Sequence, residues 1–141
     1  MSRKDEPEIS TVRLPGTGWV VQWRSDGYWR DLNDAQHRDE QSGVHLPAEE
    51  DWTRWSATLQ PQARGGEWGG VTTWWLIHGE LPEDGETPTV VLADGARPVV
   101  HLLGRVWACE WQAAAQPLTV HVGGRQFDLP FTEPHYLRFS G

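Results

Sequence analysis

Disulfides and long apolar segments are both missing from this sequence. Cys109 is the only cysteine among 141 residues, so no disulfide can form within the chain. The first eight residues are mostly charged and no apolar run follows them, which argues against a signal peptide and against a transmembrane helix. These absences predict a cytoplasmic protein.

The sequence also has few basic residues for its number of acidic ones. The chain has 12 basic and 20 acidic side chains, for a formal net charge of −8. Without a basic stripe to neutralise phosphates, binding to nucleic acid or to an anionic membrane surface is disfavoured. A basic protein partner would suit this charge, although acidity is also ordinary among soluble proteins.

Known catalytic and metal-binding patterns are absent too. The six histidines show no His-x-His or His-x₃-His spacing, the local pair that usually starts a zinc site. No Gly-x-Ser-x-Gly elbow and no phosphate loop occurs, and Cys109 lies between two tryptophans, which predicts a buried, inert thiol. We therefore expect no cofactor, no metal and no catalysis. The alternative is an enzyme whose site is assembled from distant residues: His78, His101, His121 and Glu110.

Turn residues are plentiful, with 15 glycines and 10 prolines, which is typical of short strands. Residues 18–32 are predicted to form a hairpin, because two aromatic and β-branched runs flank Asp26-Gly27. Residues 1–15 mix both charge signs with prolines and are expected to form a flexible leader, with a weak edge-strand pattern at 9–14.

Strand signals recur at short, regular spacing over residues 71–131. A nearly continuous apolar strand at 71–78 is expected to be covered on both faces. Two further pairs of strands are predicted to be hairpins, joined at Asp94-Gly95 and at Gly123-Gly124. The predicted fold is a mainly β domain over residues 16–141, an antiparallel β-sandwich or partly open barrel, immunoglobulin-like in style.

One short amphipathic helix is predicted, at 47–60. Pro47 suits a first helical turn, the acidic residues at 49–51 suit a helix N-terminus, and apolar residues then recur at helical spacing at Trp52, Trp55 and Leu59. The polar stretch from 33 to 43 shows no periodicity and is expected to be a surface loop.

Ten tryptophans are the unusual feature of the chain. Trp74 and Trp75 are consecutive on a strand and face opposite ways, so both cannot enter one core. Trp23 and Trp29 flank the first turn, and Trp68 lies among glycines. Some indoles should therefore be exposed or line a groove. The plain alternative is a core rich in tryptophan, covered by the hairpin and the helix.

The leading hypothesis from sequence is a non-catalytic, immunity-like or accessory protein that binds another protein. Its anchors would be Trp23, Trp29, Trp68 and Trp74, because tryptophan is enriched at interface hot spots. Its acidic rim would be Glu83, Asp84 and Glu86. The second hypothesis is a module for carbohydrate or another small ligand, with a tryptophan platform for stacking.

Overall fold

The computed structural model describes residues 7–43, 47–63, 73–113 and 116–129. In this part of the chain the fold is mainly β, and every strand pairing is antiparallel, as predicted. The strands are β1 (Ile9–Arg13), β2 (Val20–Arg24), β3 (Tyr28–Leu32), β4 (Thr53–Arg54), β5 (Gln62–Ala63), β6 (Thr73–Glu80), β7 (Thr89–Leu92), β8 (Val100–Leu103), β9 (Val106–Ala113), β10 (Leu118–Val122) and β11 (Arg125–Leu129).

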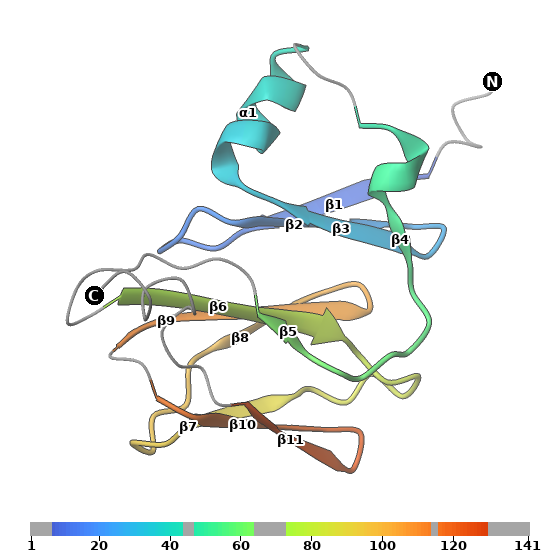
Figure 1. Cartoon of the computed structure of the whole chain (residues 1–141). Coiled ribbons are helices and arrows are strands. Elements are labelled where there is room, and N and C mark those ends of the chain that lie inside the picture. The colour runs from blue at the N-terminus through green and yellow to red at the C-terminus, as the bar shows by residue number, and fades with distance from the viewer. Residues whose placement is uncertain (1–6, 44–46, 64–72, 114–115, 130–141) are drawn as a thin grey trace, which may run out of the picture.

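The described strands form three sheets stacked as layers. Sheet A has the order β1-β2-β3-β4, sheet B has β5-β6-β9-β8, and sheet C has β11-β10-β7. Figure 1 shows sheet B in the middle, with sheet A on one side and sheet C on the other. Within this sandwich-like architecture, the protein therefore has two inter-sheet cores.

The central strand β6 explains why two cores are possible. Its residues alternate between the two faces of sheet B, and apolar side chains occupy both. Trp75 and Ile77 pack into the core between sheets B and C, whereas Leu76 packs into the core between sheets A and B. This agrees with the expectation that the apolar strand is covered on both faces.

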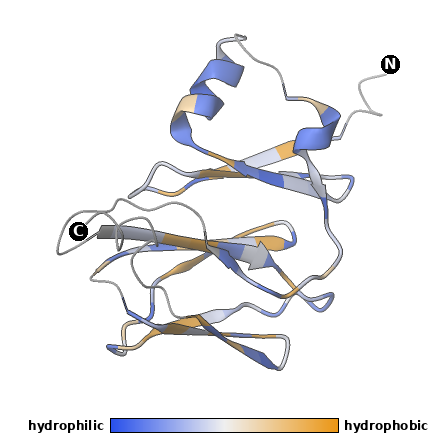
Figure 2. Ribbon diagram, viewed as in Figure 1, coloured by the Kyte–Doolittle hydropathy of each residue, from blue (hydrophilic) through white to orange (hydrophobic). Residues whose placement is uncertain are grey.

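The single described α-helix is not where the sequence predicted it. Helix α1 spans Asp34–Gln41, inside the stretch expected to be a loop. Its start is a capping box: the Asn33 side chain accepts from the Gln36 N–H, and the Gln36 side chain accepts from the Asn33 N–H. The helix has no apolar stripe, and Figure 2 shows it as almost entirely hydrophilic, so periodicity could not reveal it.

The helix predicted at 47–60 is wrong. Residues Glu49–Asp51 form only one 3₁₀ turn, and the chain is extended at β4, which pairs with β3. The Trp52 ring contacts two guanidinium groups of sheet A: its centroid lies 4.9 Å from that of Arg24 and 4.8 Å from that of Arg30. These cation–π contacts favour the extended position of Trp52 over a helical one.

Two further expectations about segments need correction. Residues 1–15 were expected to form a flexible leader, but the described part of this segment is packed on the fold. All of β1 pairs with β2, and Leu14 is fully buried. The hairpin expected at Asp94-Gly95 is also wrong. The turn itself forms, but β7 pairs with β10 in sheet C and β8 pairs with β9 in sheet B. Pro98 follows the turn and has no N–H to extend a ladder.

The other two predicted hairpins are present as β2–β3 and β10–β11. In the first, Gly27 has φ 95°, a conformation that suits glycine at a tight turn. No helix among the described residues is long and apolar enough to span a membrane.

Candidate functional site

Trp29 was expected to be an exposed anchor, and the structure contradicts this. Its side chain is only 6% exposed and packs in the core between sheets A and B. The indole N–H donates to the Glu80 carboxylate at 2.8 Å, which satisfies its one polar atom inside the core. Trp29 is therefore a structural residue.

The other predicted anchors have different surroundings. Trp23 is half-buried against the same core, and its ring covers Gly104 so closely that a Cβ there would overlap it. Trp68 lies outside the described residues. Trp74 is the predicted anchor that faces a cavity.

That cavity is the best candidate for a functional site. It has a volume of about 500 Å³ and is open to solvent on one side. Two half-buried indoles line it, Trp74 from β6 of sheet B and Trp19 from the residue directly before β2. The remaining lining residues come from the β1–β2 turn and the start of α1: Gly16, Thr17, Asn33, Asp34 and Ala35. We refer to it as the Trp19–Trp74 cavity.

Glu110 on β9 holds in place the β1–β2 turn, two of whose residues line this cavity. Its two carboxylate oxygens accept hydrogen bonds from the backbone N–H groups of Gly16 and Thr17 in the β1–β2 turn. Gly16 in turn lies against the Trp74 ring, where a Cβ would collide with the indole. Only glycine allows the turn to approach so closely, and the contact fixes the position of Trp74.

Trp19 is held by a buried polar chain between sheets A and B. Its indole N–H donates to the Asp31 carboxylate at 2.9 Å, and the same oxygen lies 3.5 Å from His78 Nε2. His78 is 1% exposed. The indole N–H of Trp19 is thus engaged inside the protein, and the residue presents ring carbon to the cavity.

Sequence reasoning missed Trp19 as a site residue. The available signal was its position directly after Gly18, at the start of a strand rather than within it. Gly18 has φ 76°, which lets the chain turn before β2 so that Trp19 reaches the edge of the core.

The predicted acidic rim does not surround the cavity. Glu83, Asp84 and Glu86 are exposed in the loop between β6 and β7, and none of them lines the Trp19–Trp74 cavity. The Glu86 side chain accepts from the Gly123 N–H, which ties this loop to the β10–β11 turn. These carboxylates are a separate surface.

The three histidines considered for a distant site do not converge. His78 and His101 pair with Ala108 from opposite sides, so they lie two strands apart in sheet B, roughly 10 Å. His121 is on sheet C. Among the described residues, no group of three or more His, Cys, Asp or Glu side chains could hold a metal ion.

Cys109 is fully buried in the core between sheets B and C. Burial, with a smaller contribution from Glu110, raises the pKa of its thiol to about 12. Because the reactive form is the thiolate, this thiol is inert at neutral pH.

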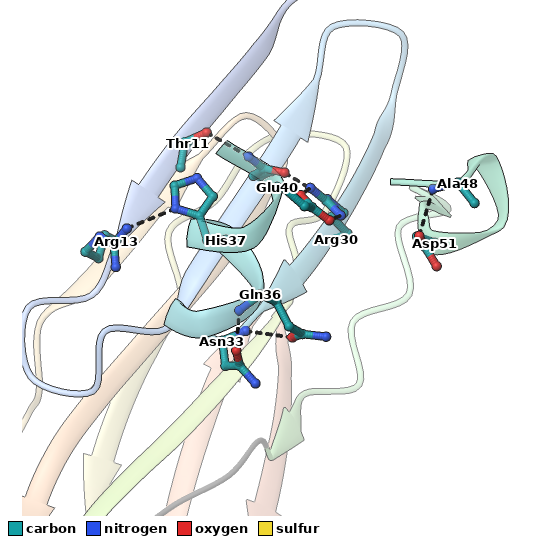
Figure 3. A network of polar contacts seen from close by, with 10 residues as sticks. Thr11, Arg13, Arg30, Asn33, Gln36, His37, Glu40, Ala48 and Asp51 are labelled. Carbon is teal, nitrogen blue, oxygen red and sulfur yellow. Dashed lines mark hydrogen bonds and ion pairs between the residues drawn. The ribbon is translucent and has the colours of Figure 1, made fainter. Parts of the chain in front are cut away.

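The outer face of sheet A is joined to α1 by polar contacts rather than apolar ones (Figure 3). Glu40 of the helix is paired with Arg30 of β3. His37 is the one buried residue of the helix, and Arg13 donates to its Nδ1 at 2.9 Å. Since a guanidinium can only donate, His37 is neutral here with its proton on Nε2.

We expect the free energy of unfolding to fall as the pH drops below about 6.5 because of His37. Burial, and then the nearby Arg13, lower the pKa of this imidazole from its ordinary value of 6.5. The unfolded chain therefore takes up the proton first, and stability present above pH 6.5 is lost as the pH falls through the folded-state pKa. Urea unfolding of the wild type and of His37→Gln between pH 5 and 8 measures this. Parallel curves for the two proteins would contradict it.

Comparison with protein-family models, with curated proteins and with solved structures finds no match to this chain. Its function has to be inferred from the site itself.

Proposed function

We propose that this is a non-catalytic, cytoplasmic binding protein that holds a small ring-bearing molecule in the Trp19–Trp74 cavity. The observation that carries the proposal is a concave site with two partly buried indoles, one from sheet B and one from the residue directly before β2 of sheet A. Its volume of about 500 Å³ lies in the range of ordinary small-molecule sites. Indoles at such a site provide large, flat contact surfaces for a ring.

The construction of the cavity supports binding rather than catalysis. Glu110 binds the backbone of the β1–β2 turn, and Asp31 binds the indole N–H of Trp19. The indoles are therefore positioned before any ligand binds. Such preorganisation lowers the entropic cost of binding. Thr17 offers a hydroxyl and Asp34 a carboxylate, but among the described residues no base is paired with that hydroxyl: Thr17 Oγ1 accepts from the backbone N–H of Trp19 instead.

Trp74→Ala is expected to weaken ligand binding by about 5- to 150-fold, because a lost stacking contact costs on the order of 1–3 kcal/mol. A ligand is first found by ligand-observed NMR with a mixed panel of monosaccharides, nucleosides and aromatic amides. Its affinity for the wild type and the variant is then measured by calorimetry.

Leu102→Ala serves as the matched control. Leu102 is 47% exposed on β8, and no residue of that strand lines the cavity. Its affinity should equal that of the wild type. Equal binding by Trp74→Ala, or no binding by any compound in the panel, would contradict the proposal.

A protein partner is the second candidate, favoured by exposed apolar side chains on or beside β8, an edge strand of sheet B among the described strands. Val99 is 71% exposed and Leu102 on β8 is 47% exposed. An edge strand with apolar side chains is a site for pairing with another chain. A stoichiometric partner lost on Leu102→Asp but retained by Trp74→Ala would support this reading. A partner lost equally from both variants would not.

A further inference from the structure

We infer that the Trp19–Trp74 cavity takes an uncharged ring that carries several hydroxyl groups, such as a pyranose sugar. The inference rests on the proposed function, because it names the ligand class of the same site. Three features of the cavity carry it: its charges are compensated within the protein, its indoles present carbon, and its polar rim suits hydroxyl groups.

Each charged side chain at the cavity already has a partner. Asp34 is paired with Arg13 through one oxygen and with Arg38 Nε at 3.0 Å through the other. The Glu110 carboxylate is occupied by two backbone N–H groups. A charged ligand would therefore lose its hydration without meeting an unpaired opposite charge. An uncharged ligand does not incur this loss.

The indoles favour a ring that meets them through carbon-bound hydrogens. The Trp19 N–H is engaged by Asp31, and one edge of the Trp74 ring lies on Gly16. What Trp19 offers a ligand is therefore ring carbon, and both indoles offer the negative face of the π system. The C–H groups on one side of a pyranose carry partial positive charge and complement such a face.

The rim of the cavity offers both donors and acceptors. Asn33 uses its side-chain oxygen in the capping box, which leaves its amide N–H groups as donors. Thr17 Oγ1 accepts from the backbone N–H of Trp19 and can still donate its own proton. Asp34 Oδ2 keeps a further lone pair as an acceptor. Hydroxyl groups can satisfy both kinds of partner, whereas a ring without them would leave the rim unpaired.

A set of rings that differ only in charge tests the inference. Methyl pyranosides of glucose, galactose, mannose and xylose are titrated calorimetrically against the wild type. The glucose ring is also tested as its uronic acid (one carboxylate) and as its 2-amino form (one ammonium). At least one neutral pyranoside should bind, and its affinity should exceed that of charged forms of the same ring by about tenfold.

Failure of the inference can be told apart from failure of the proposed function. If aromatic amides or nucleosides bind in a Trp74-dependent way and no neutral pyranoside does, the ligand class is wrong and the binding function stands. If a charged form binds as well as its neutral counterpart, the argument from compensated charge is overturned. If nothing binds, the proposed function itself fails.

Two variants with opposite expected effects sharpen the test. Asp34→Asn leaves the charges of Arg13 and Arg38 uncompensated, so the affinity for the uronic acid should rise about tenfold relative to that for the neutral ring. Arg38→Gln removes a positive charge beside the cavity, so the affinity for the amino sugar should rise instead. Arg38 is 75% exposed, so this variant keeps the test valid if Asp34→Asn does not fold. Unchanged preferences in a folded variant would overturn the inference.

Discussion

Glu80→Ala should lower the free energy of unfolding by about 3 kcal/mol, because it leaves several buried donors without an acceptor. The Glu80 side chain lies between sheets A and B and is 5% exposed. One oxygen accepts from the Trp29 indole N–H at 2.8 Å. The other accepts from the backbone N–H groups of Ser56 at 2.9 Å and Thr58 at 3.0 Å. One carboxylate thus joins β6 to β3 and to the connector after β4.

The backbone around these contacts shows how strongly they shape the chain. Ala57, between the two donors, has φ 61°, which a residue with a Cβ adopts only at a cost of about 1 kcal/mol. The Glu80 carboxylate stabilises this conformation because it collects the N–H groups on either side. Without it, both the connector and Trp29 lose the contacts that hold them.

Chemical or urea denaturation followed by tryptophan fluorescence measures the effect. Glu80→Gln should lower the free energy of unfolding by about half as much. The amide oxygen can still accept from the two backbone N–H groups, whereas the amide NH₂ group would face the indole N–H of Trp29, and two donors cannot bond to each other. Glu83→Ala, three residues later and exposed, should change stability by less than about 0.5 kcal/mol. Equal effects of Glu80→Ala and Glu83→Ala would show that the buried carboxylate is not a structural link.

Gly104→Ala should lower the free energy of unfolding by about 3 kcal/mol, from backbone strain and from displacement of Trp23. Gly104 has φ 57° in the turn between β8 and β9, and a Cβ there would overlap the Trp23 ring. Trp23 would have to leave its place beside the core between sheets A and B. The substitution therefore tests whether this indole is packed rather than free.

Gly124→Ala provides the matched control. Gly124 has φ 73° in the equivalent two-residue turn between β10 and β11, and no described atom lies within 4 Å of an added Cβ. It should cost only the strain of the left-handed conformation, about 1 kcal/mol. Equal losses of stability in the two variants, measured by urea unfolding, would mean that Trp23 does not pack on Gly104.

The local parts of the fold were predictable because their signals are local. The hairpins β2–β3 and β10–β11 follow from glycine turns between alternating runs. The apolar strand β6 follows from its composition. The hairpin at Asp94-Gly95 failed because a turn sequence does not say which sheet the next strand joins. That choice is made by β10 and β9, which lie further along the chain.

The helix was misplaced because polar contacts, not apolar spacing, decide its position. Helix α1 is held by its own cap and by arginines of β1 and β3. The spacing of Trp52 and Trp55 suits a helix equally well, but the Trp52 ring packs on two arginines of sheet A. Contacts of this kind join residues that no window of sequence brings together.

The candidate site was predictable only in part. The prediction that Trp74 and Trp75 cannot both enter one core is confirmed, because neighbours on a strand face opposite ways: Trp75 packs between sheets B and C, and Trp74 lines the cavity. Trp29 was misjudged because its acceptor, Glu80, is 51 residues away in the sequence. Trp19 and the start of α1 complete the cavity only through the stacking of sheet A on sheet B.

The most direct test of a ligand at the Trp19–Trp74 cavity is ¹⁹F NMR of protein labelled with 5-fluorotryptophan. Each of the ten tryptophans gives its own resonance, assigned by single Trp→Phe variants. On titration with a bound ring compound, the Trp19 and Trp74 resonances should shift, and that of Trp107, buried between sheets B and C, should not. Shifts confined to other tryptophans, or none from any bound compound, would contradict the account.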